Sequence, residues 1–148
     1  MQELKELFKL LDSIFDNALI DYNELIKCNR DINFLDDIYN RRLANSFLFY
    51  FSKIQDKMGV KLFKKVLYQL GEIDNFAIPF IDILNNLEKL NIIKADEWMK
   101  IREIRNELSH EYPSEIDESL QTLNLALEVF PQMEQIYKNL KDSIARYI

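Results

Sequence analysis

Helix-breaking residues are nearly absent from this chain, and their scarcity constrains the fold more than any other feature. Its 148 residues include 2 glycines and 3 prolines. Strand-and-turn architectures need such residues at frequent tight turns, whereas the abundant Leu, Ile, Lys and Glu residues favour helices. We therefore expect an all-α fold. Because this length suits one domain, we expect a single domain over residues 1–148.

Hydrophobic spacing predicts five to six helices joined by short loops. Apolar residues recur at intervals of three and four, which is typical of amphipathic helices. The predicted helices cover residues 3–27, 36–57, 60–70, 79–90, 97–110 and 114–148. Gly59 should break the pattern after the second helix, and Pro131 should kink or split the last one. Short connections favour antiparallel neighbours, so the expected architecture is an antiparallel helical bundle.

Residues with special backbone preferences mark several of these helix ends. Gly71 suits the C-cap of the third helix, and Asp96 can cap the N-terminus of the fifth. Pro113 discourages helical geometry at Tyr112 and so closes the fifth helix. Ser114 then opens the last helix.

Composition limits the chemistry that the chain can perform. With a single cysteine, Cys28, no internal disulfide can form, and a reducing compartment is expected. Cys28 itself is interpreted as an ordinary half-buried thiol. There is no His pair, Cys cluster or Gly-rich loop in the sequence, so we expect neither a metal nor a cofactor. No signal peptide or long apolar run is evident, which favours a cytoplasmic protein with no membrane segment.

Net charge argues against general nucleic-acid binding. The chain carries a formal charge of -6, while affinity for nucleic acids depends mainly on contacts with phosphates. Any work on nucleic acid must therefore use a local basic patch.

One flank of the predicted helix 97–110 carries a concentration of polar groups. At about 100° per residue, one sector of the helix holds both arginines and the only histidine. Its members are Arg102, Arg105, Asn106, Ser109 and His110. The core face lies on one side of this sector and an acidic face on the other, so the flank itself is free of carboxylates.

The flank is suited to an anion. Arginine offers a permanently charged fork that matches phosphate oxygens. His110, near the end of its helix, can give or take a proton near neutral pH. Asn106 lies four residues before it and could orient the ring. However, Arg105 and His110 are about 140° apart around the axis. They converge only if the helix ends near Ser109, if long side chains reach round, or if a second subunit supplies the opposite wall.

An ordinary structural interpretation stays open beside the functional one. In it, the arginines pair with surface carboxylates and His110 caps its helix. Trp98 and Tyr112 are interpreted as core aromatics rather than as platforms for stacked bases.

The string Arg105-Asn106-Glu107-Leu108-Ser109-His110 resembles the R-x(4–6)-H signature of HEPN domains. With Glu111 and Tyr112 it is similar to the R-x4-H-x-Y form of HepT-like toxins, a group that includes proteins labelled nucleotidyltransferase substrate-binding. Its position before a long final helix fits the same group. The stretch 51–63 also looks family-like, but the sequence assigns it no chemistry.

The resemblance implies a HEPN-like bundle that acts as a homodimeric, metal-independent ribonuclease toxin of a toxin–antitoxin pair. Arg105 would stabilise the phosphoryl group and His110 would act as general acid or base. Asn106 would position the phosphate or the imidazole. Arg102 and Ser109 are supporting substrate-binding candidates that come from the helical wheel. The resemblance also implies a minimal nucleotidyltransferase antitoxin as partner, with Tyr112 as the residue that it would adenylylate.

Two other hypotheses remain open from the sequence. The chain could be a non-catalytic subunit that binds nucleotide or a nucleotidyltransferase, which its acidity suits. It could instead be a plain helical interaction domain, in which Arg105 and His110 affect only stability.

Overall fold

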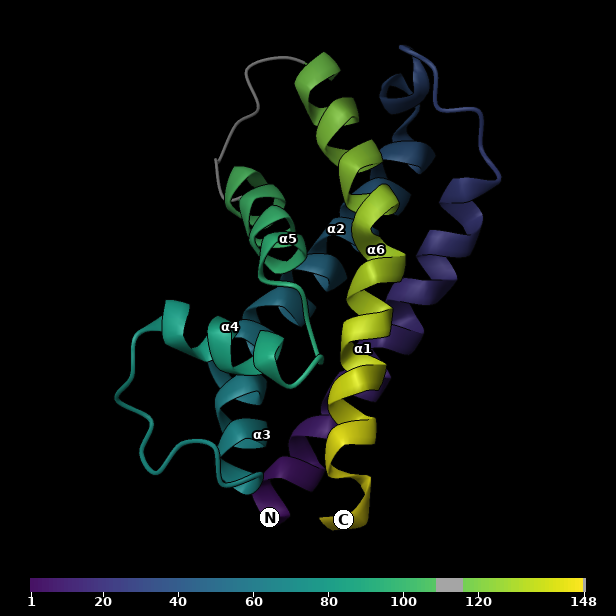
Figure 1. The fold of residues 1–148 in the computed structure, drawn as a ribbon. Helices are drawn as coiled ribbons and strands as arrows, with labels where there is room; N and C mark the ends of the chain where they lie inside the picture. The colour runs from purple at the N-terminus through teal and green to yellow at the C-terminus, as the bar shows by residue number, and fades with distance from the viewer. Residues whose placement is uncertain (109–115, 148) are drawn as a thin grey trace.

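The computed structural model describes residues 1–108 and 116–147, with side chains of 116–118 excepted, and these residues form a bundle of helices without strands (Figure 1). The α-helices are α1 (Gln2–Ile26), α2 (Ile38–Lys57), α3 (Phe63–Gln69), α4 (Phe80–Lys89), α5 (Ala95–Leu108) and α6 (Ile116–Ile144). Three shorter segments are the 3₁₀-helices η1 (Phe34–Asp36) and η3 (Ala145–Tyr147) and the π-helix η2 (Met58–Leu62). The all-α prediction is confirmed.

Helix α2 ends at Lys57, as predicted, but the chain stays helical through Gly59 instead of forming a loop there. The segments α2, η2 and α3 follow one another without interruption, and we call residues 38–69 the helical rod. A π turn, rather than a loop, contains Gly59. A Cβ on Gly59 would lie 3.4 Å from Cζ2 of Trp98 on α5, an ordinary contact distance, so the indole packs directly against the rod at this residue.

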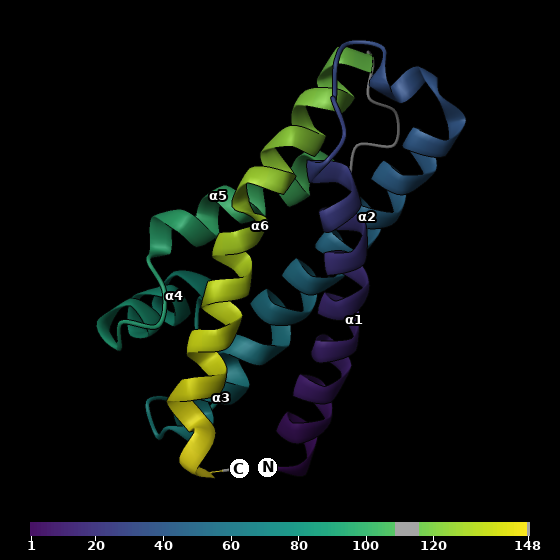
Figure 2. The same ribbon diagram turned by 90° about the vertical axis from the view of Figure 1, so that its right-hand side faces the viewer.

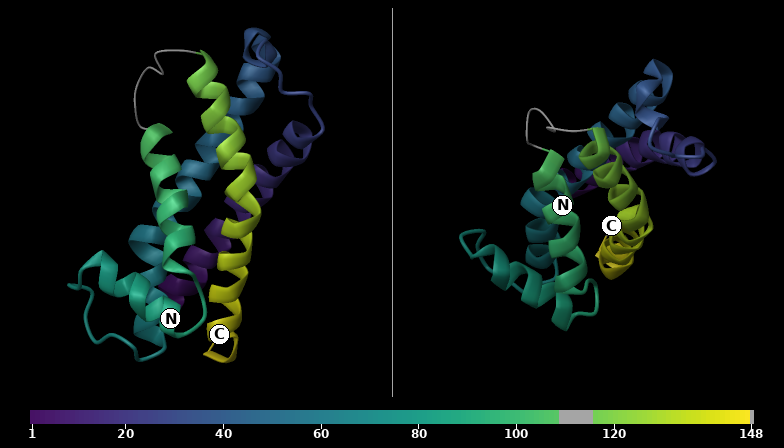
Figure 3. Two further views of the ribbon diagram at one scale, coloured as in Figure 1. Left: turned by 45° about the horizontal axis from the view of Figure 1, so that its top comes forward. Right: turned by 90° about the horizontal axis from the view of Figure 1, so that it is seen from above.

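The glycine at the end of α3 behaves as predicted. Gly71 has φ of 76°, its N–H donates to the carbonyl of Tyr68 at 3.0 Å, and the N–H of Glu72 donates to the carbonyl of Leu67 at 2.9 Å. These two bonds form a Schellman motif, which satisfies carbonyls left open by the last turn. The segment after Gly71 and helix α4 project from one side of the bundle (Figure 3).

Helix α5 begins at Ala95, two residues earlier than expected. Ala95 is already helical, so Asp96 lies in the first turn rather than at the N-cap. The N–H of Ala95 is satisfied instead by the Glu88 carboxylate at 2.9 Å. Asp96 still favours the helix because a negative charge near the N-terminus complements the helix dipole. The predicted end at His110 and the predicted start of the last helix at Ser114 lie outside the described residues.

Helix α6 runs past Pro131 without splitting. The helix is continuous from Ile116 to Ile144, and its two halves point in different directions (Figure 2), as expected for a proline inside a helix. Val129, Phe130 and Met133 around this point are buried. Packing of their side chains offsets the hydrogen bond that proline cannot donate.

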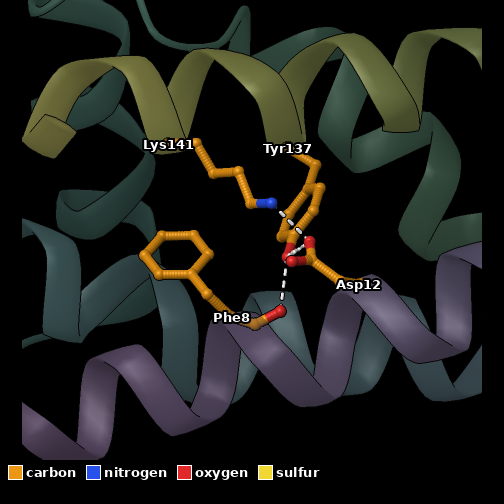
Figure 4. A network of polar contacts seen from close by, with 4 residues as sticks. All are labelled: Phe8, Asp12, Tyr137 and Lys141. Carbon is orange, nitrogen blue, oxygen red and sulfur yellow. Dashed lines mark hydrogen bonds and ion pairs between the residues drawn. The ribbon is translucent and has the colours of Figure 1, made fainter.

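A polar contact inside the bundle joins α1 to α6 (Figure 4). The buried hydroxyl of Tyr137 lies 2.7 Å from Asp12 Oδ1 and 2.9 Å from the carbonyl of Phe8. Lys141 pairs with the same carboxylate and lies 4.9 Å from the centre of the Tyr137 ring. Burial and the nearby Asp12 raise the pKa of the Tyr137 phenol. The phenol therefore stays neutral and donates a hydrogen bond that fixes the two helices together.

Several smaller expectations can be compared with the described residues. Trp98 is fully buried and is a core aromatic, as predicted. Cys28, two residues after the end of α1, is half-buried and its thiol donates to the Glu24 carbonyl at 3.3 Å. None of the helices in the described part of the chain is both long and apolar enough to cross a bilayer.

Candidate functional site

The candidate site lies where the last turn of α5 meets the rod. Two contacts define this interface: Trp98 packs against Gly59, and Arg105 binds Asp56. The residue numbers rise from 98 to 105 along α5 while those of their contacts fall from 59 to 56 along the rod, so α5 runs antiparallel to the rod here. Trp98 and Arg105 are seven residues apart, two turns along one face of α5. The packed indole therefore fixes the level at which Arg105 emerges.

The guanidinium of Arg105 is held by a carboxylate through two hydrogen bonds. Its Nε donates to Asp56 Oδ1 at 3.1 Å and its Nη2 donates to Asp56 Oδ2 at 3.0 Å. The pair is at the surface, since the Arg105 and Asp56 side chains are 25% and 49% exposed. This bidentate geometry orients the plane of the guanidinium and uses one of its edges.

The predicted flank carries no carboxylate from α5 itself, as expected. However, a carboxylate from another helix binds Arg105 on this flank, which the prediction did not include. The acid comes from α2, 49 residues earlier in the sequence, and a helical wheel of one helix cannot contain it. Asp56 occupies the Nε and Nη2 edge of Arg105. Among the described residues, no hydrogen bond involves the Nη1 group of Arg105.

The second arginine of the predicted flank turns away from the first. Arg102 is exposed and its guanidinium carbon lies 4.8 Å from the centre of the Phe80 ring on α4. Arg105 contacts α2 instead. The two guanidinium groups therefore have different neighbours, and the helical wheel, which placed them in one sector, did not anticipate this separation.

The remaining predicted site residues divide into described and undescribed ones. Asn106 is exposed in the same turn as Arg105. Ser109, His110 and Tyr112 lie outside the described residues, so their predicted roles stay predictions. Of the proposed constellation, the structure therefore describes the phosphate-binding half and not the proton-transferring half.

Two residues of the rod at its interface with α5 were missed by reasoning from the sequence. The first is Asp56, and a signal for it existed: it is the only acidic residue between positions 38 and 69. The second is Gln55, whose polar side chain is buried in the described structure, with 7% of the residue exposed. Its amide nitrogen lies 3.4 Å from the position of a Cβ on Gly59. Both residues fall in the stretch 51–63, to which the sequence assigned no chemistry.

The floor of the site is rigid. Trp98 packs edge-on against Phe63 with ring centres 4.6 Å apart and an interplanar angle of 66°. Its indole Nε1 is buried and has no hydrogen-bond partner in the described structure. A buried N–H group without a partner lowers the free energy of unfolding, so packing of the indole must offset this loss. Such packing, beside a π turn, restricts movement of α5 against the rod.

The described residues contain no group of three or more His, Cys, Asp or Glu side chains that could hold a metal ion. Comparisons of the chain with known protein families, with functionally characterised proteins and with solved structures find no match in any of the three. The resemblance to HEPN domains therefore depends on the residues from Arg105 to Tyr112 and on their place after a helix of an all-helical bundle.

Proposed function

We propose that this protein is a HEPN-type, metal-independent ribonuclease and the toxin of a toxin–antitoxin pair. The observation that carries the proposal is the geometry of Arg105. The first residue of the R-x4-H string is partly exposed and is held by Asp56 through two hydrogen bonds, while its Nη1 group makes no hydrogen bond within the described part of the chain. A fixed guanidinium at the surface is what stabilisation of a phosphoryl group requires.

Asp56 supports this role because it removes the freedom of a long side chain. An arginine that is already ordered loses less conformational entropy when it binds a phosphate. The carboxylate also repels a second anion. This repulsion favours a ligand that takes the far edge of the guanidinium over one that displaces Asp56.

The reaction proposed is transesterification within RNA. A ribose 2′-oxygen forms a bond to the adjacent phosphorus, and the bond from phosphorus to the 5′-oxygen of the next nucleotide breaks. One proton leaves the 2′-hydroxyl and one is delivered to the departing 5′-oxygen, so the products are a 2′,3′-cyclic phosphate and a 5′-hydroxyl. His110 would transfer a proton, while Arg105 stabilises the charge on the phosphoryl oxygens. Asn106, Ser109 and Arg102 would contact the substrate.

The proposal includes a partner and an assembly. Two copies would form a homodimer in the cytoplasm and face each other across a shared cleft. A minimal nucleotidyltransferase would act as antitoxin by adenylylating Tyr112. The added phosphate would place negative charge two residues from His110 and seven from Arg105 in sequence, on the same short segment, where it would neutralise the anion site.

RNA cleavage in the presence of a chelator tests the proposal. Purified protein with EDTA should cleave cellular RNA and leave 2′,3′-cyclic phosphate ends, and Arg105→Ala and His110→Ala should abolish cleavage. Arg146→Ala is the matched control, since Arg146 is an exposed arginine on η3. Intact cellular RNA after incubation with the wild-type protein, combined with normal growth of cells that express it, would contradict the proposal.

A second function has one observation in its favour. Because Arg105 already holds a carboxylate, the site is partly neutralised within the chain. This suits a non-catalytic subunit that binds a nucleotide or a nucleotidyltransferase. Such a subunit would form a stable complex with the transferase and bind nucleotide without cleaving RNA.

A further inference from the structure

Positive charge is concentrated in the helical rod, although the chain as a whole is acidic. The rod contains seven of the 19 Lys and Arg residues and one of the 25 acidic residues, Asp56. The seven are Arg41, Arg42, Lys53, Lys57, Lys61, Lys64 and Lys65. The only acid of the rod is bound to Arg105 of α5. The rest of the chain therefore carries nearly all of the negative charge.

Part of this charge lies on one exposed line of α2. At about 100° per residue, the members of this line fall within about 40° on either side of Phe49. They are Ile38, Arg42, Asn45, Phe49, Lys53 and Asp56, and each of them is exposed. We call these residues the α2 stripe. From Arg42 to Asp56 the stripe is about 21 Å long at the rise of an α-helix.

The centre of the α2 stripe is an aromatic ring in solvent. Phe49 is 56% exposed. Lys53 Nζ lies 5.4 Å from the centre of its ring, and the ring of Tyr50 meets it edge-on with centres 5.5 Å apart. The ring lies on the stripe between Arg42 and Lys53, with more than half of its residue exposed to solvent. It does match a surface on which a base stacks while cations contact the flanking phosphates.

The α2 stripe ends at the candidate site. Its last residue, Asp56, is the residue that holds Arg105. One cation of the rod is balanced by α1: Lys65 pairs with Glu3 at 2.9 Å, which lowers the pKa of Glu3. Arg42 and Lys53 have no such carboxylate partner among the described residues, so their charge remains available to a ligand.

From this arrangement we propose that the α2 stripe binds single-stranded RNA and leads it to Arg105. Phe49 stacks on a base, Arg42 and Lys53 contact phosphates on either side of it, and the strand reaches Arg105 at the end of the stripe. This inference rests on the proposed ribonuclease and names its substrate as unpaired RNA. A duplex would not fit, because its stacked bases cannot reach an isolated ring.

Binding of an RNA that cannot be cleaved tests the stripe separately from catalysis. The probe is a fluorescein-labelled 2′-O-methyl oligouridylate of about 15 nucleotides, which lacks the attacking hydroxyl, and anisotropy gives its affinity. Phe49→Ala should weaken binding about tenfold or more, because a stacked base contributes on that scale. Arg42→Glu with Lys53→Glu should weaken it further and flatten the salt dependence, since about two phosphate contacts are lost.

Matched variants make the outcome decisive. Arg42→Lys with Lys53→Arg keeps the charge and should keep the affinity, and Lys138→Glu and Tyr147→Ala change an exposed cation and an exposed aromatic ring elsewhere. Circular dichroism should show each variant folded. The inference is overturned if the stripe variants bind the probe as tightly as the wild-type protein does. It is also overturned if Phe49→Ala converts a dimer into a monomer, because the stripe would then be an interface between two copies. If the probe binds through the stripe but RNA is never cleaved, the inference stands and the proposed ribonuclease fails; if RNA is cleaved but the stripe variants bind normally, the reverse holds.

Discussion

The contact between Arg105 and Asp56 can be measured by a double-mutant cycle. The variants are Arg105→Ala, Asp56→Ala and the two combined, and urea unfolding gives the free energy of unfolding for each. The geometry is favourable, with two charge-assisted bonds at 3.1 and 3.0 Å. Solvent reaches both partners, whose side chains are 25% and 49% exposed. Exposed pairs couple by about 0.2–1 kcal/mol, so a well-aligned bidentate pair should lie near the top of this range.

We therefore expect a coupling energy of about 1 kcal/mol in low salt, falling when 1 M NaCl shortens the screening length to about 3 Å. A coupling of about 1 kcal/mol changes an equilibrium about fivefold. That is small enough for phosphate to bind Arg105 beside Asp56 or in its place. A coupling well above about 2 kcal/mol would mean that the pair is closed to ligands, and it would refute our interpretation of the site. A coupling indistinguishable from zero would mean that Asp56 does not hold the guanidinium in solution.

The other predictions concern stability, measured by urea or thermal unfolding. Gly59→Ala should stabilise the fold by about 0.5–1 kcal/mol, because the position is helical and the new Cβ would lie at an ordinary contact distance of 3.4 Å from Trp98; destabilisation would show that the indole cannot tolerate it. Gly71→Ala should destabilise by about 1 kcal/mol, because φ is 76°. Tyr137→Phe should cost about 1–2 kcal/mol through loss of its buried hydrogen bonds, and an unchanged midpoint would contradict this. Burial raises the pKa of Glu134, so the folded state binds more protons than the unfolded chain. The contribution of Glu134 to the free energy of unfolding therefore falls as pH rises from the pKa of the unfolded chain through the pKa of the folded state. Glu134→Gln should raise the unfolding midpoint at pH 7 and leave it unchanged near pH 3.

The helices were predictable because their signal is local. Spacing of apolar residues along α1 and α2, and the glycine that ends α3, depend on interactions within a few residues. The errors occurred where a tertiary contact overrode a local preference. Gly59 was expected to break a helix, yet packing of Trp98 against it favours continuation through a π turn. At Pro131, by contrast, the kink that was predicted as one of two outcomes is present, and burial of the residues around it favours continuation of α6.

The site was predictable only in part, for the same reason. The sequence identified Arg105 as a candidate because arginine, amide and imidazole share a flank of one helix. It could not identify the carboxylate that Arg105 meets, since Asp56 lies on another helix and 49 residues away. A charge count along the chain would have helped: a single acid among seven basic residues is unusual enough to need a reason. The structure supplies a reason, which is that this acid orients the arginine of the candidate site.

An acidic protein can still bind RNA if its charges are separated by more than a screening length. At physiological ionic strength this length is about 8 Å, and a helix with its side chains is about 10–12 Å across. A phosphate on the α2 stripe therefore responds mainly to Arg42 and Lys53, while carboxylates on helices behind the rod are largely screened. The net charge of -6 then limits indiscriminate binding to other surfaces of the molecule. In the proposed ribonuclease, the acidity that seemed to argue against RNA binding would instead restrict RNA to the one face that ends at Arg105.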